Sequence, residues 1–512
     1  MLVKTFGSAV YGVDATTITI ETNLDRGVNF HLVGLPDNAV KESQHRITAA
    51  LKNNEFRWPG FKITINMAPA DIRKEGSAYD LPIALGILAA SEQAEMPELD
   101  RFIIMGELSL DGGVQPVNGV LPIAIQARKE GFKGMVVPAE NAREAAIVDG
   151  LEVYAAEDLK SVVEHLEGSR LLEPTVVNTR EEFKEHLDNP LFDFSEVKGQ
   201  ENIKRALEIS AAGGHNVILI GPPGAGKTML AKRMPSILPP LTLNEALETT
   251  KIHSVAGNLG GNASLIAQRP YRSPHHSISD VALVGGGGFP QPGEISLAHN
   301  GILFLDELPE FQRTVLEVMR QPMEDRKVTI SRAKFTVDYP AAFMLVASMN
   351  PCPCGYYNHP NKECVCSPGL VQKYLNKISG PLLDRIDIHV EVTPVSYDEM
   401  SSKRPAEKSA DIRARVVKAR EIQTQRFEGE DNIYNNAQMQ PRQMRAVCEV
   451  GPEGNELLRN AIDRLNLSGR AYDRILKVAR TIADLEGEEK IQAAHIAEAV
   501  QYRSLDREGW MG

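Results

Sequence analysis

The chain has 512 residues, a formal net charge of −12, 42% hydrophobic residues and 24% charged residues. This length predicts about two to four domains, and the composition excludes a disordered chain. The acidic balance excludes a surface that is basic throughout, although a local basic channel remains compatible with it. The longest apolar stretch, residues 81–90, contains Pro82 and is too short to cross a membrane, and the N-terminus lacks the apolar core of a signal peptide. We therefore expect a cytoplasmic protein without a membrane partner.

Short strands alternate with helical stretches over residues 1–168, which predicts an N-terminal α/β domain. Residues 73–82 and 106–112 resemble segments of the Lon-protease-like domain that also occurs in RadA-type recombination proteins. A Ser–Lys dyad would give such a domain peptidase activity by nucleophilic attack. Ala78 and Ile123 stand at the two dyad positions. The resemblance therefore implies a scaffold without protease activity, used for assembly or DNA contact.

The remainder of the chain divides into three parts. Residues 169–192 predict a connector that carries a helix, residues 193–394 hold the nucleotide-binding motifs, and residues 395–512 predict a linker and a helical lid. In the lid, Ser468 is placed to begin a helix. One apolar face of that helix is predicted from the spacing of Ile475, Val478, Ala479 and Ile482.

A phosphate-binding loop is the most informative motif of the chain. It has the G-x-x-x-x-G-K-[ST] spacing, follows the apolar run 217–220 and precedes a helix-like stretch. Its residues are Gly221, Pro222, Pro223, Gly224, Ala225, Gly226, Lys227 and Thr228. Glycines let backbone N–H groups approach phosphate oxygens, the lysine contacts the β- and γ-phosphates, and the threonine hydroxyl can bind Mg²⁺. The motif therefore predicts binding of ATP with Mg²⁺.

A second motif predicts ATP hydrolysis. The apolar run 302–305 has the composition of a buried strand, and it ends in Asp306 and Glu307. Asp306 is placed to hold Mg²⁺, and Glu307 to orient the attacking water. A strand that merely ends in a solvated acidic pair is the structural alternative, and the phosphate-binding loop upstream argues against it.

The residues around these motifs resemble a known family. Residues 197–200, 211–216, 272–279 and 292–299 are similar to motifs of the magnesium-chelatase-type AAA+ ATPases, and most of all to their ComM/YifB branch. The resemblance covers nearly the whole chain. It implies an α/β AAA+ core with a helical lid, and a homo-oligomeric ring, a hexamer, with ATP sites between subunits.

The resemblance also assigns roles to single residues. It implies that Asn350 is the sensor 1 residue, which helps to position the water, and that Arg385 is the arginine finger, which acts on a neighbouring subunit. A structural salt bridge with Asp384 or Asp387 is the alternative for Arg385. Arg470 matches sensor 2 of the lid, with Arg474 as its rival.

Two insertions characterise this branch, at residues 273–295 and about 326–340. Residues 326–337 alternate as strands do and hold four basic residues without an acid. In related ring helicases, the corresponding hairpin enters the central pore and contacts the DNA backbone. This resemblance implies that Arg332 and Lys334 contact DNA phosphates, for which positive charge suffices. A merely solvated hairpin is the alternative.

Four of the five cysteines lie close together in the sequence. Cys352 and Cys354 form one C-x-C pair, and Cys364 and Cys366 form another after nine intervening residues. Four thiolates match the count of a structural zinc site, although the spacing within each pair is tighter than usual. Four reduced cysteines without metal are the alternative.

Two functions remain open at this point. The first is a DNA motor, a helicase or branch-migration ATPase of recombination or natural transformation. The second is the motor subunit of a magnesium chelatase, which remodels a partner protein for metal insertion. The basic hairpin and the RadA-like domain favour the DNA motor.

Overall fold

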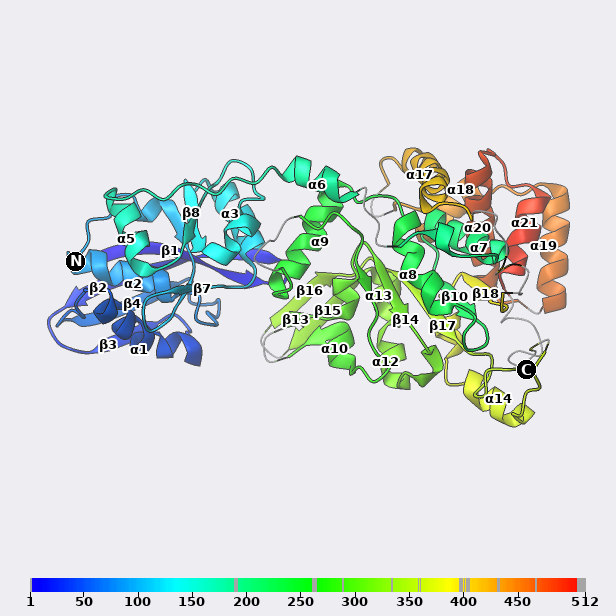
Figure 1. Cartoon of the computed structure of the whole chain (residues 1–512), viewed down its shortest axis with the longest axis horizontal. Helices are drawn as coiled ribbons and strands as arrows, with labels where there is room; N and C mark the ends of the chain where they lie inside the picture. The colour runs from blue at the N-terminus through cyan, green and yellow to red at the C-terminus, as the bar shows by residue number, and fades with distance from the viewer. Residues whose placement is uncertain are drawn as a thin grey trace.

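A computed structural model describes residues 2–187, 192–259, 265–287, 290–332, 335–357, 361–395, 406–430, 433–465 and 467–503, together with residues 359, 399 and 401. The molecule is elongated, and an N-terminal α/β domain, a second α/β region and a group of C-terminal helices follow one another along its long axis (Figure 1). Among the described helices, none has both the length and the apolar character needed to cross a bilayer.

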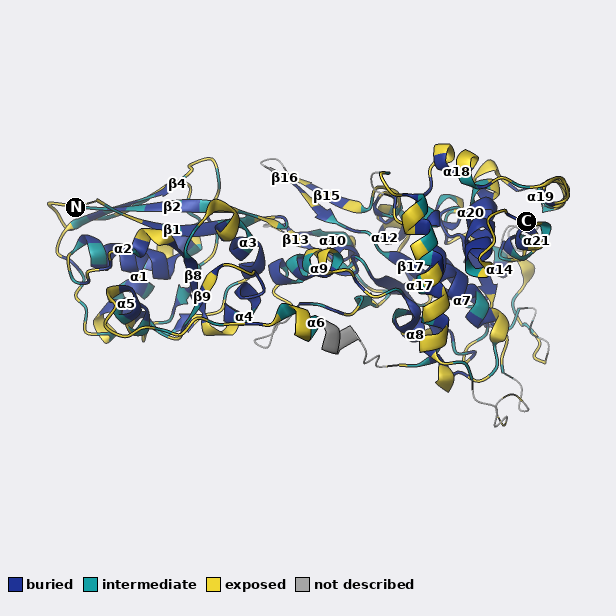
Figure 2. Cartoon of the chain, turned by 90° about the horizontal axis from the view of Figure 1, so that it is seen from above, coloured by how far each residue is buried: buried dark blue, intermediate teal, exposed yellow. Residues whose placement is uncertain are grey.

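The N-terminal domain is built on a seven-stranded sheet of order β3-β4-β2-β1-β5-β8-β9. Its strands are β1 (Leu2–Tyr11), β2 (Asp14–Asp25), β3 (Phe30–Val33), β4 (Lys62–Ala68), β5 (Phe102–Ile104), β8 (Gly134–Pro138) and β9 (Glu152–Ala156), and a small separate ribbon is formed by β6 (Glu107–Leu108) and β7 (Val114–Gln115). Its helices are α1 (Asn38–Asn53), α2 (Asp80–Ala90), α3 (Val120–Glu130), α4 (Ala142–Ala145) and α5 (Leu159–Glu167). Helices α1 to α3 lie on one side of the long strands (Figure 2). The apolar run 81–90 is therefore the core helix α2, which is buried on nearly all sides.

The central region is built on a five-stranded parallel sheet of order β11-β14-β17-β10-β18. Its strands are β10 (Val217–Ile220), β11 (Tyr271–Arg272), β14 (Ile302–Leu305), β17 (Met344–Met349) and β18 (Ile388–Glu391). Every residue of β10, β14 and β17 is buried, which explains why these strands are apolar throughout except for Ser348 in β17. The carboxyl ends of parallel strands meet at one edge of a sheet, so this fold brings the ends of β10, β14 and β17 together.

Helices and short strands surround this sheet. They are α7 (Glu201–Gly213), α8 (Lys227–Ile237), α9 (Leu243–Val255), α10 (Asp280–Val284), β12 (Gly285–Gly286), β13 (Gln291–Pro292), α11 (Glu294–Leu297), α12 (Arg313–Val318), α13 (Arg320–Asp325), β15 (Lys327–Arg332), β16 (Phe335–Pro340), α14 (Pro368–Leu375) and α15 (Gly380–Leu383). The strands β15 and β16 form the antiparallel hairpin that the alternation over residues 326–337 predicts.

The N-terminal domain packs on the central region in two places. Helix α9 contributes Ala246 to the apolar core of the N-terminal domain, and the Gly119 N–H donates to the Ser254 carbonyl at 3.1 Å. The turn between β1 and β2 reaches the hairpin, where a β-carbon added at Gly12 would lie 2.9 Å from Val337. The connector adds helix α6 (Thr179–Leu187), in agreement with the helix expected in residues 169–192.

The C-terminal part is helical, with α17 (Ser409–Arg426), α18 (Pro441–Val447), α19 (Pro452–Leu465), α20 (Gly469–Glu486) and α21 (Ala493–Gln501). Ser468 caps α20 by accepting a hydrogen bond from the Ala471 N–H at 3.2 Å, as its position predicts. The predicted apolar face of α20 is confirmed, because Ile475, Val478, Ala479 and Ile482 are all buried.

Candidate nucleotide-binding and ATPase site

The phosphate-binding loop connects β10 to α8, which begins at Lys227. Gly224 and Gly226 have φ angles of +77° and +90°, which side chains other than glycine rarely adopt. A β-carbon at Gly221 would lie 2.3 Å from the Val392 carbonyl oxygen, so the chain needs glycine there for close approach. The Gln200 side chain donates to the Ala225 carbonyl at 3.0 Å and ties the loop to the start of α7. The loop is thus held from both flanks.

Lys227 and Asn350 meet across the sheet edge. The Lys227 ammonium donates to the Gly221 carbonyl at 2.7 Å, to the Pro222 carbonyl at 3.0 Å and to Asn350 Oδ1 at 3.1 Å. Burial lowers the pKa of Lys227, and the nearby Asp306 and Glu307 carboxylates oppose this shift. An ammonium already surrounded by oxygens at the head of a glycine loop fits the phosphate contact that the sequence predicts.

Asp306 and Thr228 form the second half of the site. The Thr228 hydroxyl donates to Asp306 Oδ2 at 2.7 Å, and the Ser348 hydroxyl of β17 donates to Asp306 Oδ1. A hydroxyl and a carboxylate in contact are the oxygen donors that Mg²⁺ takes at nucleotide sites. The residues present therefore fit Mg²⁺ bound with ATP. Ser348 was not anticipated from the sequence, although its place two residues before Asn350 at the end of a buried strand could have indicated it.

Glu307 lies beside Asp306 with a φ angle of +54°, and its side chain is 57% exposed. His276, from the insertion at residues 273–295, places Nδ1 4.0 Å from Glu307 Oε2. The His275 and His276 rings lie 4.0 Å apart, centroid to centroid. The sequence indicated no link between these histidines and Glu307. The fold creates it, since about thirty residues separate them along the chain.

Arg385 and Arg470 lie together but apart from the phosphate-binding loop. Both line a cavity of about 110 Å³ whose described lining residues are Glu324, Asp384, Arg385, Arg470, Asp473, Arg474 and Lys477. Arg385 forms an ion pair with Glu324 at 2.5 Å and donates to the Pro381 carbonyl at 2.6 Å. The partner of Arg385 is therefore Glu324, rather than the Asp384 or Asp387 that the sequence offered as alternatives.

The two candidates for sensor 2 differ in their contacts. Arg470 is 65% exposed and lies 3.4 Å from Asp384 Oδ2, whereas Arg474 is mostly buried and pairs with Asp387 at 3.0 Å. Although burial alone would raise it, the charge of Arg474 and the hydrogen bond from His215 hold the pKa of Asp387 below its usual range. Arg474 is thus held in an ion pair within its own chain, whereas the guanidinium of Arg470 is accessible to solvent.

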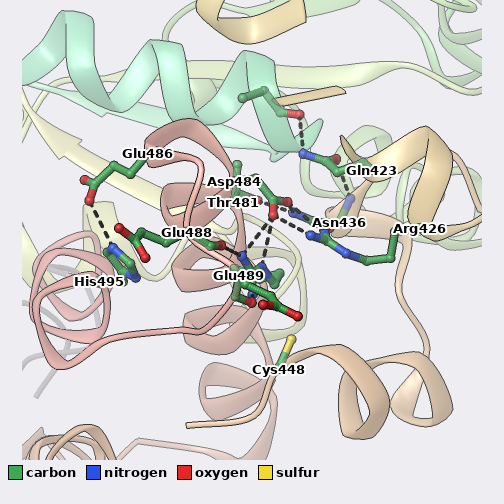
Figure 3. A network of polar contacts seen from close by, with 12 residues as sticks. Gln423, Arg426, Asn436, Cys448, Thr481, Asp484, Glu486, Glu488, Glu489 and His495 are labelled. Carbon is green, nitrogen blue, oxygen red and sulfur yellow. Dashed lines mark hydrogen bonds and ion pairs between the residues drawn. The ribbon is translucent and has the colours of Figure 1, made fainter. Parts of the chain in front are cut away.

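A buried polar network connects the C-terminal helices to the sheet. Figure 3 shows Asp484 at its centre, where Arg426 and Asn436 donate to Oδ2 at 2.8 Å and 2.7 Å. Asn436 also contacts the Thr481 hydroxyl at 3.1 Å, and that hydroxyl lies 2.8 Å from His215 Nε2.

His215 carries the network to the segment of Arg385. Its Nδ1 lies 3.0 Å from Asp387 Oδ2, and both side chains are fully buried. His215 lies two residues before β10, and Asp387 directly precedes β18. The network therefore joins the lid helices to the starts of two neighbouring strands, of which β10 leads into the phosphate-binding loop. Nothing in the local sequence indicates this connection.

The hairpin β15–β16 leads away from the central sheet (Figure 2). Val328, Ile330, Val337 and Tyr339 face inward and are buried, whereas Lys327, Thr329, Ser331, Thr336 and Asp338 face solvent. Lys327 pairs with Asp338 at 2.9 Å, so one of the four basic residues is neutralised by an acid just beyond residues 326–337. Lys334 and the side chain of Arg332 lie outside the described residues.

The four clustered cysteines come together in space, and the two positions of the Ser–Lys dyad lie in the N-terminal domain. Cys352, Cys354, Cys364 and Cys366 converge, and their sulfur atoms lie within 4.8 Å of one another. In the N-terminal domain, Ile123 is buried in α3, and the Ser77 hydroxyl, next to Ala78, donates to Glu107.

Comparisons with known proteins identify the family. The profile described as "Magnesium chelatase, subunit ChlI" matches residues 193–400, "Subunit ChlI of Mg-chelatase" matches residues 20–141, and "Magnesium chelatase, subunit ChlI C-terminal" matches residues 406–503. Competence protein ComM of Haemophilus influenzae is 44% identical over 98% of this chain and 97% of its own length. YifB of Escherichia coli is 44% identical over 98% of this chain and 96% of its own length.

One further match is partial. Lon protease 2 of Bacillus subtilis is 32% identical over 28% of this chain and 27% of its own length. The full-length matches, the parallel sheet and the geometry around Lys227 and Asp306 agree with one another. The chain belongs to the magnesium-chelatase-like family of ComM and YifB, and its central region is an AAA+-type ATPase.

Proposed function

We propose that the chain is the subunit of a hexameric ring that hydrolyses ATP to move along DNA, as a helicase or branch-migration motor in recombination or natural transformation. The 44% identity to a protein whose name links it to competence supports a role on incoming DNA. The observation that carries the proposal is the hairpin β15–β16, which combines a buried apolar face with a polar exposed face and leads away from the central sheet.

Within one ATP site, different residues bind the phosphates, bind Mg²⁺ and position the attacking water. Lys227 and the loop glycines hold the phosphates, and Thr228 with Asp306 holds Mg²⁺, which when bound offsets the charge of the phosphate oxygens. Glu307 orients the attacking water and takes its proton, while Asn350 fixes the water from the other side.

The ring is supported by the position of Arg385. This residue shares a cavity with Arg470 in which no described lining residue belongs to the phosphate-binding loop. Its Nε is buried and has no hydrogen-bond partner among the described residues. A guanidinium placed in this way can complete the site of a neighbouring copy, where it would stabilise charge in the transition state.

The N-terminal domain acts as a support in this proposal. Val10 and Val13, on either side of the β1–β2 turn, pack against the apolar cluster that holds the inner face of the hairpin. A domain without the Ser–Lys dyad can in this way fix the direction of the hairpin relative to the ring.

DNA binding and DNA-stimulated ATP hydrolysis test the proposal. Arg332→Ala combined with Lys334→Ala should weaken DNA binding and abolish stimulation, and should leave basal hydrolysis unchanged. Wild-type affinity should fall steeply with salt because counterions are released, and the double variant should lose roughly one unit of slope, or less, for each lost phosphate contact.

Lys327→Ala is the matched control, because this lysine is basic and exposed but already paired with Asp338 at the base of the hairpin. It should change neither affinity nor salt slope. If the Arg332/Lys334 variant binds DNA like wild type, DNA contact belongs elsewhere, for example on the N-terminal domain.

The alternative is a chelatase-type motor that remodels a partner protein for metal insertion. It is favoured by the family profile, whose description names a magnesium-chelatase subunit. A wild-type protein that hydrolyses ATP but binds neither single-stranded, double-stranded nor branched DNA would support this alternative and refute the DNA motor.

A further inference from the structure

The four clustered cysteines have the geometry of a metal site. Cys352 Sγ lies 3.3 Å from Cys354 Sγ and 3.7 Å from Cys364 Sγ, and Cys354 Sγ lies 3.6 Å from Cys364 Sγ. Two zinc–sulfur bonds of about 2.3 Å that meet at a tetrahedral angle place their sulfur atoms ~3.8 Å apart. Cys366 Sγ lies within 4.8 Å of the other three sulfur atoms, so the cluster leaves room for one metal ion at its centre.

The same distances exclude a cluster of several iron atoms. An iron–sulfur cluster inserts several iron atoms between its cysteines, which would hold these sulfur atoms much further apart. Four thiolates around one centre are the ligand set of structural zinc, and they leave no position open for water or substrate. None of the four cysteines forms a disulfide. The arrangement therefore indicates a closed, non-catalytic zinc site.

The site adjoins the catalytic machinery on one side. Cys352 follows Asn350 by two residues at the end of β17 and is fully buried. Gly355, with a φ angle of +83°, approaches the phosphate-binding loop so closely that a β-carbon there would lie 2.5 Å from Pro223 Cδ. The loop that carries the first cysteine pair therefore touches the phosphate-binding loop directly.

On the other side, the second cysteine pair leads into α14. Cys366 lies two residues before Pro368, the first residue of that helix. Tyr374 of α14 packs in the same apolar cluster as Cys352. A metal bound by both pairs would tie the end of β17 to α14, and would fix Asn350 between them.

We propose that Cys352, Cys354, Cys364 and Cys366 bind one zinc ion, and that this ion braces Asn350 and the phosphate-binding loop in the geometry needed for ATP hydrolysis. The inference is independent of what the motor acts on, since it concerns only how the site is held.

Metal analysis of the full chain, purified under reducing conditions without chelator, tests the binding. About one zinc per chain is expected, and X-ray absorption should show a first shell of four sulfur atoms at about 2.3 Å. Cys364→Ser combined with Cys366→Ser should reduce zinc to less than about one tenth per chain. Cys448→Ala is the control, because Cys448 is buried among the C-terminal helices and should leave zinc unchanged. Iron in place of zinc, nitrogen or oxygen in the first shell, or zinc retained by the double variant would overturn the site.

The bracing role is tested on wild-type protein, so that a folding defect in a variant cannot decide the outcome. An organomercurial that blocks thiols releases zinc, which a chromophoric indicator measures, and the ATPase rate is followed in parallel. The maximal rate of hydrolysis should fall ~10-fold or more as zinc leaves, in the range seen when support around a metal ligand is lost. Adding excess thiol and then zinc alone should restore it. Zinc-free protein with a wild-type maximal rate would refute the bracing role.

Discussion

The ion pair between Arg385 and Glu324 makes a quantitative prediction about ring assembly. In the single chain the Arg385 side chain is 10% exposed and the Glu324 side chain is 56% exposed, with Nη2 2.5 Å from Oε1. For Arg385 to reach a neighbour's phosphates, it has to leave Glu324. Glu324→Gln keeps the size of the side chain and its ability to accept a hydrogen bond, but it removes the charge that holds the guanidinium.

The size of the effect follows from the exposure of Glu324. An ion pair with one partner mostly in water contributes about 0–1 kcal/mol, because solvent screens it. If that is the cost of releasing Arg385, Glu324→Gln should raise the ATPase rate by at most about fivefold, since each 1.4 kcal/mol corresponds to about a factor of ten. Arg385→Ala, in contrast, should lower the rate by ~10³-fold or more, as loss of an arginine finger does.

Steady-state ATP hydrolysis over a series of protein concentrations is the assay, with nucleotide affinity as the control for an intact phosphate-binding loop. The gain in Glu324→Gln should be greatest at low protein concentration, where assembly limits the rate. A loss of activity in Glu324→Gln comparable to that in Arg385→Ala would refute the reasoning. It would mean that Glu324 positions the Arg385 guanidinium for catalysis and does not restrain it from reaching the neighbouring site.

Lys227→Ala should abolish ATP binding, whereas Glu307→Gln should bind ATP and hydrolyse it ~10²–10⁴-fold more slowly, as titration with a fluorescent nucleotide and turnover assays would show; normal turnover by Glu307→Gln would reject its role. Mixing Arg385→Ala with Lys227→Ala should partly restore hydrolysis, because each variant supplies what the other lacks; no rescue would contradict shared sites. Burial lowers the pKa of both His215 and His389. Below pH ~6.5 the unfolded chain therefore takes up protons that the folded chain cannot, so the free energy of unfolding should fall as the pH falls, by up to about 1.4 kcal/mol per pH unit for each histidine. Denaturant unfolding at several pH values should show that the free energy of unfolding depends less on pH in His389→Leu than in wild type. An unchanged pH dependence would exclude His389 as one of its causes.

The local backbone and the nucleotide chemistry could be predicted from the sequence. The spacing from Gly221 to Thr228 specifies a loop that exposes backbone N–H groups, and the buried strands that precede Gly221 and Asp306 are readable as apolar runs. The apolar face of α20 follows from a repeat of three and four residues. These features depend on neighbours within one or two turns of the chain, which is why the amino-acid order is sufficient for them.

Residues far apart in the sequence meet only through tertiary packing. His276 lies beside Glu307, and Ser348 contacts Asp306, where the carboxyl ends of the parallel strands meet. Glu324 pairs with Arg385 away from that edge, before β18 begins. No local pattern specifies such a partner, since the pairing depends on how whole elements stack.

The cysteine cluster depends both on the local sequence and on tertiary packing. Their number and clustering predicted a metal site from the sequence alone, but the tight spacing within each pair left the geometry open. The fold of the loop brings the four sulfur atoms within 4.8 Å of one another, and it places them beside Asn350 and the phosphate-binding loop. The sequence by itself thus determined which chemical groups this protein has, and the tertiary structure decided which of them act together, because contacts between distant residues are fixed only when the core packs.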